Sequence, residues 1–459
     1  MKTKINNKRY IYDPLYGVIY LPNFIWEVIS CPELQRLREV RLCNINSFCL
    51  IGGANINRYE HAIGTCYLAQ ECLNSHHHLN QISEKEYRHF MLAALFHDVA
   101  SAAFGHSVEY IESKEGFDHE KAFEYVVIGK KGESYQYKGA TLEPIFFGML
   151  KEISSKVSEE DLNTISKIIY GKGRFGPLIK ATLDLDNIDN VFRLAYHIGL
   201  IKSGEIPLNL AKSLWVENGK QTVRKETVPL IEEWCKVRKN LYLLLLLNPE
   251  EFSGKCMLND AIELAKTKDV HPFNWHDVDY ELLEKLSKKS AETSIIISRL
   301  MKGNLYGCIG IFSSTKTDKY KIFIDTVKKR ELESIISKKI RSLIMTKQLR
   351  LFDKPSRHRP SSIFRSAMIA FHPIIDVNKT ERQVRFQTEE GEIVQIGNSS
   401  NQLLIGAFFR NLDLDMYNIV NIPTASINKI RKEIHTFLSN NLGDRNIKEI
   451  KLYDEINKI

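Results

Sequence analysis

Residues Phe96 to Ser107 read FHDVASAAFGHS, in which His97 and Asp98 follow directly on a strongly apolar run. That run, residues 90 to 96, predicts a buried helix that ends at this pair. Burial of an ionised aspartate beside an imidazole costs several kcal/mol unless its charge is compensated, and a divalent cation supplies that compensation. The pair alone fits two interpretations equally well: two metal ligands, or a histidine hydrogen-bonded to a carboxylate that caps the helix.

Another histidine stands in NRYEHAIGTCYLA, residues 57–69. Here His61 is predicted on a helix whose small residues allow close packing against a neighbour, and Arg58 lies on the adjoining face. A mononuclear metal site needs about four protein ligands, and they must come from separate helices to surround the ion. His61 therefore strengthens the metal interpretation of the His97–Asp98 pair.

Three aspartates, Asp184, Asp186 and Asp189, crowd the otherwise apolar stretch TLDLDNIDNVFRLAYHIG, residues 182–199. Carboxylates in such number within an apolar segment indicate a nearby cation. An EF-hand is excluded, because the D-x-D-x-x-D spacing is wrong and the loop glycine is missing. The three segments together predict a metal centre built on helices.

The organisation of the chain is that of a large globular protein. Its 459 residues are 43% hydrophobic and 26% charged, which excludes disordered and collagen-like classes. Aromatic and β-branched residues at the start predict a hairpin or extended arm, and apolar residues at helical spacing continue to about residue 310. Beyond Lys302–Gly303, short β-rich runs such as Tyr320 to Ile324 alternate with turns. We predict a mainly α fold with an N-terminal arm at 1–30, a helical core at 31–315 and an appended smaller α+β C-terminal region at 316–459.

Several features concern the compartment. No apolar run approaches the roughly 18 residues that a membrane-spanning helix needs, and the N-terminus shows no export signal. The eight cysteines include no C-x-x-C pair, which indicates free thiols rather than a zinc or redox centre. These features predict a cytoplasmic protein with no membrane partner.

The charge balance points to anionic partners. A net charge of +8 favours polyanions such as nucleotides or nucleic acid without selecting one. The segment Lys347 to Arg365 is rich in arginine, lysine, proline and serine, and predicts an exposed loop with a positive face. Most such runs are solvated surface; the alternative is a strip that binds phosphates or nucleic acid.

The order of histidine, His-Asp and aspartate resembles the HD-domain metal-dependent phosphohydrolases. The similarity extends to their branch of deoxynucleoside triphosphate triphosphohydrolases, because QRLR, R-Y-E-H, HD, F-G-H, D-H-E and D-N-I-D follow one another at similar spacing. It starts at about Tyr10, where YDPLYG resembles the family's D-P-I-H-G, and reaches near residue 310. The resemblance implies an HD-domain helical core with one divalent metal ion per active site.

The resemblance implies four metal ligands, namely His61, His97, Asp98 and Asp186. Mn, Fe, Mg, Zn and Ni all suit such imidazole and carboxylate ligands. Asp186 is preferred to Asp189 because the family's ligand is the first aspartate of a D-x-x-D pair. Asp189 would then support the site from one helical turn away.

Further residues are implied to act on the substrate. His106 and His119 match family histidines near the scissile bond, and imidazoles suit general acid work at neutral pH. Glu109 stands where the family has the acidic partner of His106, and would hold its tautomer. Positions that contact substrate in the family are occupied by Arg58, Asn187 and Asn190.

The sequence departs from the family pattern near the site. Ser101 replaces a further histidine, and Leu42 replaces a glutamine that contacts the sugar. Asn187 and Asn190 replace a lysine and a tyrosine that hold triphosphate and sugar. The helix that follows Arg238 contains no second arginine where the family often places a phosphate clamp. Triphosphate binding is therefore weakened unless C-terminal loops supply basic groups, for example Lys347, Arg350, Arg357, Arg359 or Arg365.

The family also has a regulatory nucleotide site between subunits. Arg9, Gln35 and Arg38 match positions that contribute to it, whereas Ser30 stands where an aspartate is expected. The resemblance therefore implies a homo-oligomer, as a dimer, tetramer or hexamer, with allosteric nucleotide activation of altered base preference.

The sequence supports three functional hypotheses. The favoured one is hydrolysis of deoxynucleoside triphosphates to deoxynucleoside and triphosphate, either for nucleotide-pool control or for defence against phage. The second is an HD phosphodiesterase or nucleotidase that acts on another nucleotide or on single-stranded nucleic acid, as the lost clamp residues suggest. The third is a nucleotide-sensing module with little turnover.

Overall fold

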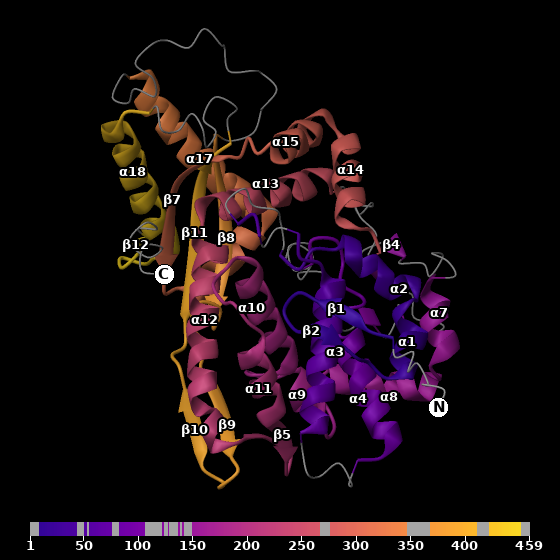
Figure 1. Cartoon of the computed structure of the whole chain (residues 1–459). Helices are drawn as coiled ribbons and strands as arrows, with labels where there is room; N and C mark the ends of the chain where they lie inside the picture. The colour runs from indigo at the N-terminus through magenta and orange to yellow at the C-terminus, as the bar shows by residue number, and fades with distance from the viewer. Residues whose placement is uncertain are drawn as a thin grey trace, which may run out of the picture.

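Figure 1 shows the chain as a computed structural model. The described residues are 9–43, 50–52, 55–75, 82–105, 149–266, 276–346, 368–410 and 422–450, with a few further positions between 122 and 141. Within them, helices dominate as far as residue 301, and sheets with covering helices follow. The prediction of a mainly α core with an appended α+β region is confirmed.

The helical core is arranged around α3 (Arg58–Asn74). This helix packs against α4 (Glu84–Phe96), α10 (Leu185–His197) and α11 (Glu205–Ser213). Its first turns therefore face both the end of α4 and the start of α10. The remaining helices of the core are α1 (Asn23–Ile29), α2 (Pro32–Gln35), α7 (Met149–Lys156), α8 (Glu159–Ile169), α9 (Gly176–Ile179), α12 (Val228–Leu247), α13 (Pro249–Ala265), α14 (Asp279–Lys289) and α15 (Ala291–Met301).

The three helices α3, α4 and α10 each begin at a side-chain cap. Asn57 accepts a hydrogen bond from the backbone N–H of Glu60, and Asp184 accepts one from that of Asn187. Ser83 forms a reciprocal capping box with a glutamate at the start of α4. Such caps satisfy N–H groups that have no partner inside the helix, and each contributes about 1 kcal/mol. They fix where each helix starts.

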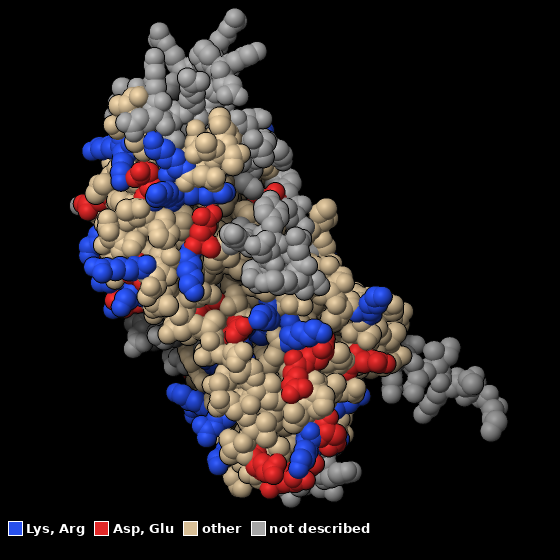
Figure 2. Space-filling view, turned by 90° about the vertical axis from the view of Figure 1, so that its left-hand side faces the viewer, with Lys and Arg blue, Asp and Glu red and all other residues tan. Residues whose placement is uncertain are grey.

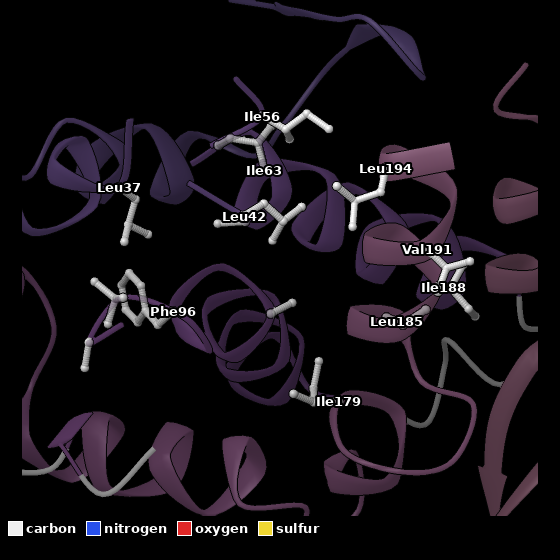
Figure 3. Packing of buried hydrophobic residues seen from close by; sticks show 14 of the residues in the cluster. Leu37, Leu42, Ile56, Ile63, Phe96, Ile179, Leu185, Ile188, Val191 and Leu194 are labelled. Atoms are coloured by element: carbon white, nitrogen blue, oxygen red, sulfur yellow. The ribbon is translucent and has the colours of Figure 1, made fainter. Parts of the chain in front are cut away.

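The interior of the core is apolar and continuous. Figure 3 shows Ile63 of α3, Phe96 of α4 and Val191 of α10 among the buried side chains that these helices share. Burial of a side chain of this size contributes about 1.5–3 kcal/mol. The packing holds the ends of α4 and α10 firmly beside α3.

The predicted N-terminal arm is a short hairpin. Strand β1 (Ile11–Asp13) pairs antiparallel with β2 (Gly17–Ile19), and Gly17 has a φ of 74° at the turn. Asp13 closes the turn, because its Oδ1 accepts hydrogen bonds from the N–H groups of Leu15 and Tyr16 at 2.9 Å.

The C-terminal region is a four-stranded antiparallel sheet with a helix layer on each face. Its strand order is β12-β7-β11-β8. Helix α13 packs on one face of the sheet. The other face of the sheet is covered by helices whose apolar side chains form a second buried cluster with those of the strands (Figure 1). The strands and covering helices are β7 (Gly307–Ser314), β8 (Ile369–Val377), β11 (Asn401–Phe409), β12 (Lys448–Glu449), α16 (Tyr320–Ile324), α17 (Thr326–Met345) and α18 (Thr424–Leu442).

A second sheet joins the C-terminal region to the helical core. Hairpin β5 (Leu214–Glu217) and β6 (Lys220–Val223) belongs to the core, whereas β9 (Val384–Thr388) and β10 (Ile393–Ile396) come from the C-terminal region. Strand β9 pairs in parallel with β6, with Thr222 opposite Gln387. The segment between β8 and β9 is thereby carried back to the helical core.

Buried ion pairs reinforce this attachment. Arg410, at the end of β11, contacts Asp260 of α13 at 2.7 Å and Glu333 of α17 at 2.9 Å. Lys329 of α17 contacts Glu263 of α13 at 2.5 Å. Because these charges are almost fully buried, removal of one partner would leave an uncompensated charge in the interior. The C-terminal region is therefore fixed to α13.

Some sequence-based element predictions were wrong. Tyr320 to Ile324 was expected as a β run but forms the short helix α16, in which only Phe323 is buried. The hairpin β5–β6 and helix α17 were not predicted. Strand β7, which belongs to the C-terminal sheet, begins before the predicted boundary at 315.

The surface of the C-terminal region carries positive charge. Figure 2 shows lysines and arginines grouped over the upper part of one face. Helix α17 carries the exposed residues Lys338, Lys339 and Arg341, and α18 carries Lys432. The predicted basic loop from Lys347 to Arg365 lies outside the described residues. Among the described helices, none combines the length and apolarity that a membrane crossing requires.

Candidate metal centre

Four side chains meet where the start of α3, the turn that follows α4 and the start of α10 come together. His61 Nε2 lies 3.1 Å from His97 Nε2 and 3.0 Å from Asp186 Oδ1. Asp98 Oδ2 lies 3.9 Å from His61 Nε2 and 3.8 Å from His97 Nε2. The structure thus brings together all four residues that the sequence suggested as ligands, and the two histidines with Asp186 form a group of atoms that could hold a metal ion.

Hydrogen bonds orient both imidazoles toward this point. His61 Nδ1 lies 2.7 Å from Asp189 Oδ2, and His97 Nδ1 lies 2.9 Å from the carbonyl oxygen of Ala94. Both partners are acceptors, so each Nδ1 carries the proton and, in the neutral rings, each Nε2 presents a lone pair. Two lone pairs 3.1 Å apart repel each other unless a cation lies with them. A metal ion bound through both Nε2 atoms fits this arrangement, because metal-ligating histidines usually donate their other N–H to such an acceptor.

The electrostatics of the group also favour a cation. Burial lowers the pKa of His61, but hydrogen bonds to Asp186 and Asp189 outweigh it and raise the pKa to about 10. Burial would raise the pKa of Asp186, but His97 and His61 hold it well below its usual range. His61 therefore binds a proton strongly in the absence of metal, whereas Asp186 stays ionised, and a metal ion competes with that proton for the Nε2 lone pair.

Asp189 belongs to a buried network beneath His61. Arg193 donates to both of its oxygens, through Nε at 2.8 Å and Nη2 at 2.9 Å. Tyr16 donates a third hydrogen bond to Asp189 at 2.8 Å. Arg193 Nη1 also contacts Asp13 at 2.9 Å and Glu60 at 2.6 Å. The N-terminal hairpin, α3 and α10 thus hold His61 in place together.

This network was largely missed from the sequence, although Asp189 was expected to support the site. Asp189 and Arg193 are four residues apart on one helix, a spacing at which opposite charges meet, and that signal could have been used. Asp13 stands in the YDPLYG segment that was noted only for its resemblance. Its contact with Arg193 joins residues 180 positions apart, which no local pattern reveals.

Asp98 is held by its own partners. Arg58 Nη1 donates to Asp98 Oδ2 at 2.5 Å, and Ser101 Oγ donates to Asp98 Oδ1 at 3.0 Å. Arg58, suggested from the sequence as a substrate contact, therefore neutralises and orients a carboxylate of the site. Ser101, which stands where the family has a histidine, likewise orients Asp98.

The turn after Asp98 is fixed from the opposite side. Arg36 Nη2 donates to the carbonyl oxygens of Val99 and Ser101, at 3.1 and 2.6 Å. Phe104 has a φ of 54°, an uncommon conformation for a bulky residue, and its N–H donates to Asp279 at 2.8 Å. These contacts hold the chain that leads away from the metal centre.

Gly64 is the point at which the backbone of α3 lies close to this network. A Cβ atom at Gly64 would lie 2.1 Å from both Arg193 Nη2 and Asp189 Oδ1. Because neither side chain can move without breaking a buried ion pair, we expect Gly64→Ala to lower the free energy of unfolding by about 2–3 kcal/mol. Chemical denaturation measures this change.

A control glycine is available in β7. A Cβ at Gly310 would lie 3.4 Å from ring atoms of Phe312 and 3.8 Å from Glu449 Oε1, and both are ordinary contacts. Gly310→Ala should therefore change the free energy of unfolding by less than about 1 kcal/mol. Equal effects of the two substitutions would show that Gly64 does not mark a close approach.

The remaining suggested substrate residues, Asn187 and Asn190, lie on α10, and Leu42, which departs from the family pattern, lies elsewhere in the core. Asn187 Nδ2 donates to Asp184 Oδ1 at 2.8 Å, and Asn187 Oδ1 accepts from Arg382 Nη1 at 2.7 Å. Asn190 is half-buried, one helical turn after Asp186. Leu42 is buried among the apolar residues of the core.

The suggested regulatory residues gather around α1. The Arg9 guanidinium carbon lies 5.9 Å from the ring centroid of Trp26. Gln35 donates to the carbonyl oxygen of Ile29 at 2.7 Å, and Arg38 is exposed with its Nη1 3.4 Å from Gln35 Oε1. Their regulatory role remains a prediction. His106, Glu109 and His119, the suggested catalytic residues, lie outside the described residues.

Comparison with known proteins gives distant relatives. No protein-family model matches the sequence. The chain is 27% identical over 243 residues to deoxynucleoside triphosphate triphosphohydrolase SAMHD1 of Bos taurus, over 47% of this chain and 40% of that protein. It is 23% identical over 306 residues to an uncharacterised protein of Methanocaldococcus jannaschii, over 64% of this chain and 58% of that protein. The chain therefore spans about half the length of these curated relatives.

A solved structure is similar to this chain in its fold. A phosphohydrolase of Bacteroides thetaiotaomicron superposes with a TM-score of 0.59 at 17% identity, covering 88% of this chain and 100% of that one. The likeness shows that the two chains share a fold.

Proposed function

We propose that the chain is a metal-dependent phosphohydrolase of the HD-domain type, because its sequence is similar to those of deoxynucleoside triphosphate triphosphohydrolases. Its proposed reaction is hydrolysis of a deoxynucleoside triphosphate to deoxynucleoside and triphosphate. The observation that carries this proposal is the group of two histidine Nε2 atoms and an Asp186 oxygen within 3.6 Å of one another, with Asp98 beside them.

The residues of the chain would prepare this site for phosphate chemistry. A divalent ion held by the four side chains would polarise a phosphate oxygen and lower the pKa of a bound water toward about 7. Asp189 and the Ala94 carbonyl keep both Nε2 atoms turned toward the ion. Arg58 reduces the negative charge of Asp98, so the centre presents less repulsion to an anionic substrate. His106 and His119 are proposed from the sequence as proton donors to the leaving oxygen.

A second candidate function has support from one contact. Asn187, which stands where the family has a lysine, is engaged by Asp184 and Arg382. The position at which the family has its lysine is therefore occupied by an amide that is already hydrogen-bonded within the chain. This favours, as the alternative, an HD phosphodiesterase or nucleotidase with another nucleotide or single-stranded nucleic acid as substrate.

We also propose a nucleotide-dependent homo-oligomer, for which the gathering of Arg9, Gln35 and Arg38 around α1 gives support. Its activator would be a nucleoside triphosphate. Sedimentation of the protein with and without each nucleotide would report such assembly.

The function is tested by following triphosphate release. The purified protein is incubated with Mn²⁺ or Mg²⁺ and the four deoxynucleoside triphosphates, singly and mixed, because an activator can be required. We expect triphosphate from the wild type and none from Asp186→Ala. No triphosphate in any mixture, with metal bound, would overturn the proposal and move the search to cyclic nucleotides, nucleotide monophosphates and single-stranded nucleic acid.

A further inference from the structure

A segment of the C-terminal region reaches the helix that carries Asp186. Arg382 lies just before β9, and its Nη1 donates a hydrogen bond to Asn187 Oδ1 at 2.7 Å. Asn187 directly follows Asp186 in the first turn of α10. Arg382 is therefore held beside the first turn of α10, the turn that carries Asp186, by a residue 195 positions away in the sequence.

A second arginine approaches the same place from α12. Arg238 is only 3% exposed, and its guanidinium carbon lies 4.1 Å from the ring centroid of Tyr242 and 5.8 Å from that of Trp234. Trp234 in turn donates to the carbonyl oxygen of Asn187 at 3.4 Å. The Nε atoms of Arg238 and Arg382 are buried and have no hydrogen-bond partner. Two guanidinium groups with spare donors thus flank the start of α10.

In the part of the chain that the structure describes, no carboxylate lies within ion-pair distance of these arginines, although the charge of Asp376 acts on Arg238. Two neighbouring acids are engaged elsewhere: Glu381 contacts Lys239 at 2.7 Å, and Asp376 accepts hydrogen bonds from three neutral side chains. Within the same ranges, no carboxylate forms an ion pair with either Arg238 or Arg382. The guanidinium of Arg382, which is only partly buried, is therefore not paired with a described carboxylate.

The positive charges also act on one another. Burial, and then the charge of Arg382, lower the pKa of Arg238. Burial, with Lys255 and Arg238, lowers the pKa of the half-buried Lys379 to about 8. Buried like charges are unfavourable without an anion among them. The surroundings of Arg382 therefore favour a ligand with several negative charges.

We propose that Arg382 binds the polyphosphate of the nucleotide at this centre, in place of the lysine that the family has at position 187. The identity of the nucleotide rests on the proposed function. Arginine can offer two parallel N–H donors to phosphate oxygens, and the hydrogen bond to Asn187 fixes its orientation before the ligand arrives. In this chain the positively charged side chain thus comes from the C-terminal segment and not from α10, and Asn187 is the residue that positions it.

The test is the affinity for inorganic triphosphate, measured by calorimetry on the metal-loaded full-length protein. Arg382→Gln should weaken binding by about 10- to 100-fold, as expected for loss of hydrogen bonds between charged groups. Arg385→Gln is the matched control, because Arg385 is an exposed arginine on β9 three residues further on. It should change the affinity by less than about twofold, since exposed charges interact weakly across solvent. Equal affinities for the two variants would overturn the proposal.

A charge-transfer variant separates ligand binding from a structural role. Asn187→Lys alone should not improve binding, because the new ammonium would face the like charge of Arg382. In the double variant Asn187→Lys/Arg382→Gln that repulsion is gone, and most of the lost triphosphate affinity should return. If Arg382→Gln binds weakly and the double variant binds no better, Arg382 has only a structural role and the proposal is overturned.

Two further measurements keep the result unambiguous. If Arg382→Gln lowers the melting temperature, the variant Arg382→Lys is measured instead. Retained triphosphate affinity in Arg382→Lys supports the proposal, and loss of that affinity overturns the proposal.

Triphosphate binding requires no turnover, so binding is measured separately from hydrolysis. Arg382-dependent binding without hydrolysis of any deoxynucleoside triphosphate would contradict the proposed function alone, and hydrolysis with Arg382-independent binding would contradict this inference alone.

Discussion

Asp186→Ala is expected to abolish metal binding and hydrolysis while leaving the fold intact. Asp186 Oδ1 contacts both imidazoles, at 3.0 and 3.6 Å, so its loss removes one of the four ligands. Activity should fall by well over about 100-fold, because even residues that merely orient ligands commonly contribute about 10- to 100-fold. The Asp186 side chain is 33% exposed, and α10 keeps its cap at Asp184, so the melting temperature should change little. Elemental analysis and calorimetry with Mn²⁺ measure the binding.

The control for this substitution is Asp318→Ala. Asp318 is also an aspartate in a first helical turn, but its side chain is 72% exposed and it lies in the C-terminal region. It should retain metal and activity, and its stability should fall by no more than about 1 kcal/mol. Full metal content in Asp186→Ala would remove Asp186 from the ligand set and point to a different carboxylate.

The site illustrates what the sequence could predict. His97 and Asp98 were visible because a charged pair at the end of an apolar helix needs compensation. His61 and the three aspartates were noticed from the residues, and the resemblance then selected Asp186 as the ligand. The structure places His61 Nε2 3.0 Å from Asp186 Oδ1. Arg382 could not be placed in this way, since its contact with Asn187 depends on the parallel pairing of β9 with β6. Parallel pairing of distant strands leaves no local signal in the chain.

The fold shows the same division between local and distant information. The caps at Asn57 and Ser83 are local, and the helices that they start were predicted. The hairpin β5–β6 was missed although its turn, Asn218–Gly219, has φ angles of 50° and 73° and the Asn-Gly sequence that favours such a turn. Tyr320 to Ile324 has strand-like composition, but here it only leads into α17, and Phe323 is its single buried side chain. Composition alone could not show that residues 214–223 form strands whereas Tyr320 to Ile324 forms a helix.

Asp189→Asn is expected to reduce both stability and metal affinity, in contrast with Asp186→Ala. The substitution keeps the shape of a side chain that is 0% exposed, but it removes a charge that Arg193 contacts through two nitrogens. Breaking a buried ion pair of this kind lowers the free energy of unfolding by about 3–5 kcal/mol. The loss is reduced here because Asp13 and Glu60 still contact Arg193. Chemical denaturation without metal measures this loss.

The effect on metal affinity follows from the His61 tautomer. Asp189 can only accept, so it keeps the proton on His61 Nδ1 and leaves Nε2 free to bind an ion. An asparagine amide can donate to Nδ1 instead, which would move the imidazole proton to Nε2 and block a ligand. We therefore expect the affinity for Mn²⁺ to fall by about 10- to 100-fold although all four ligands are present. Unchanged affinity in a destabilised Asp189→Asn protein would show that Asp189 only supports the fold, and that the ligand geometry does not depend on the network beneath His61.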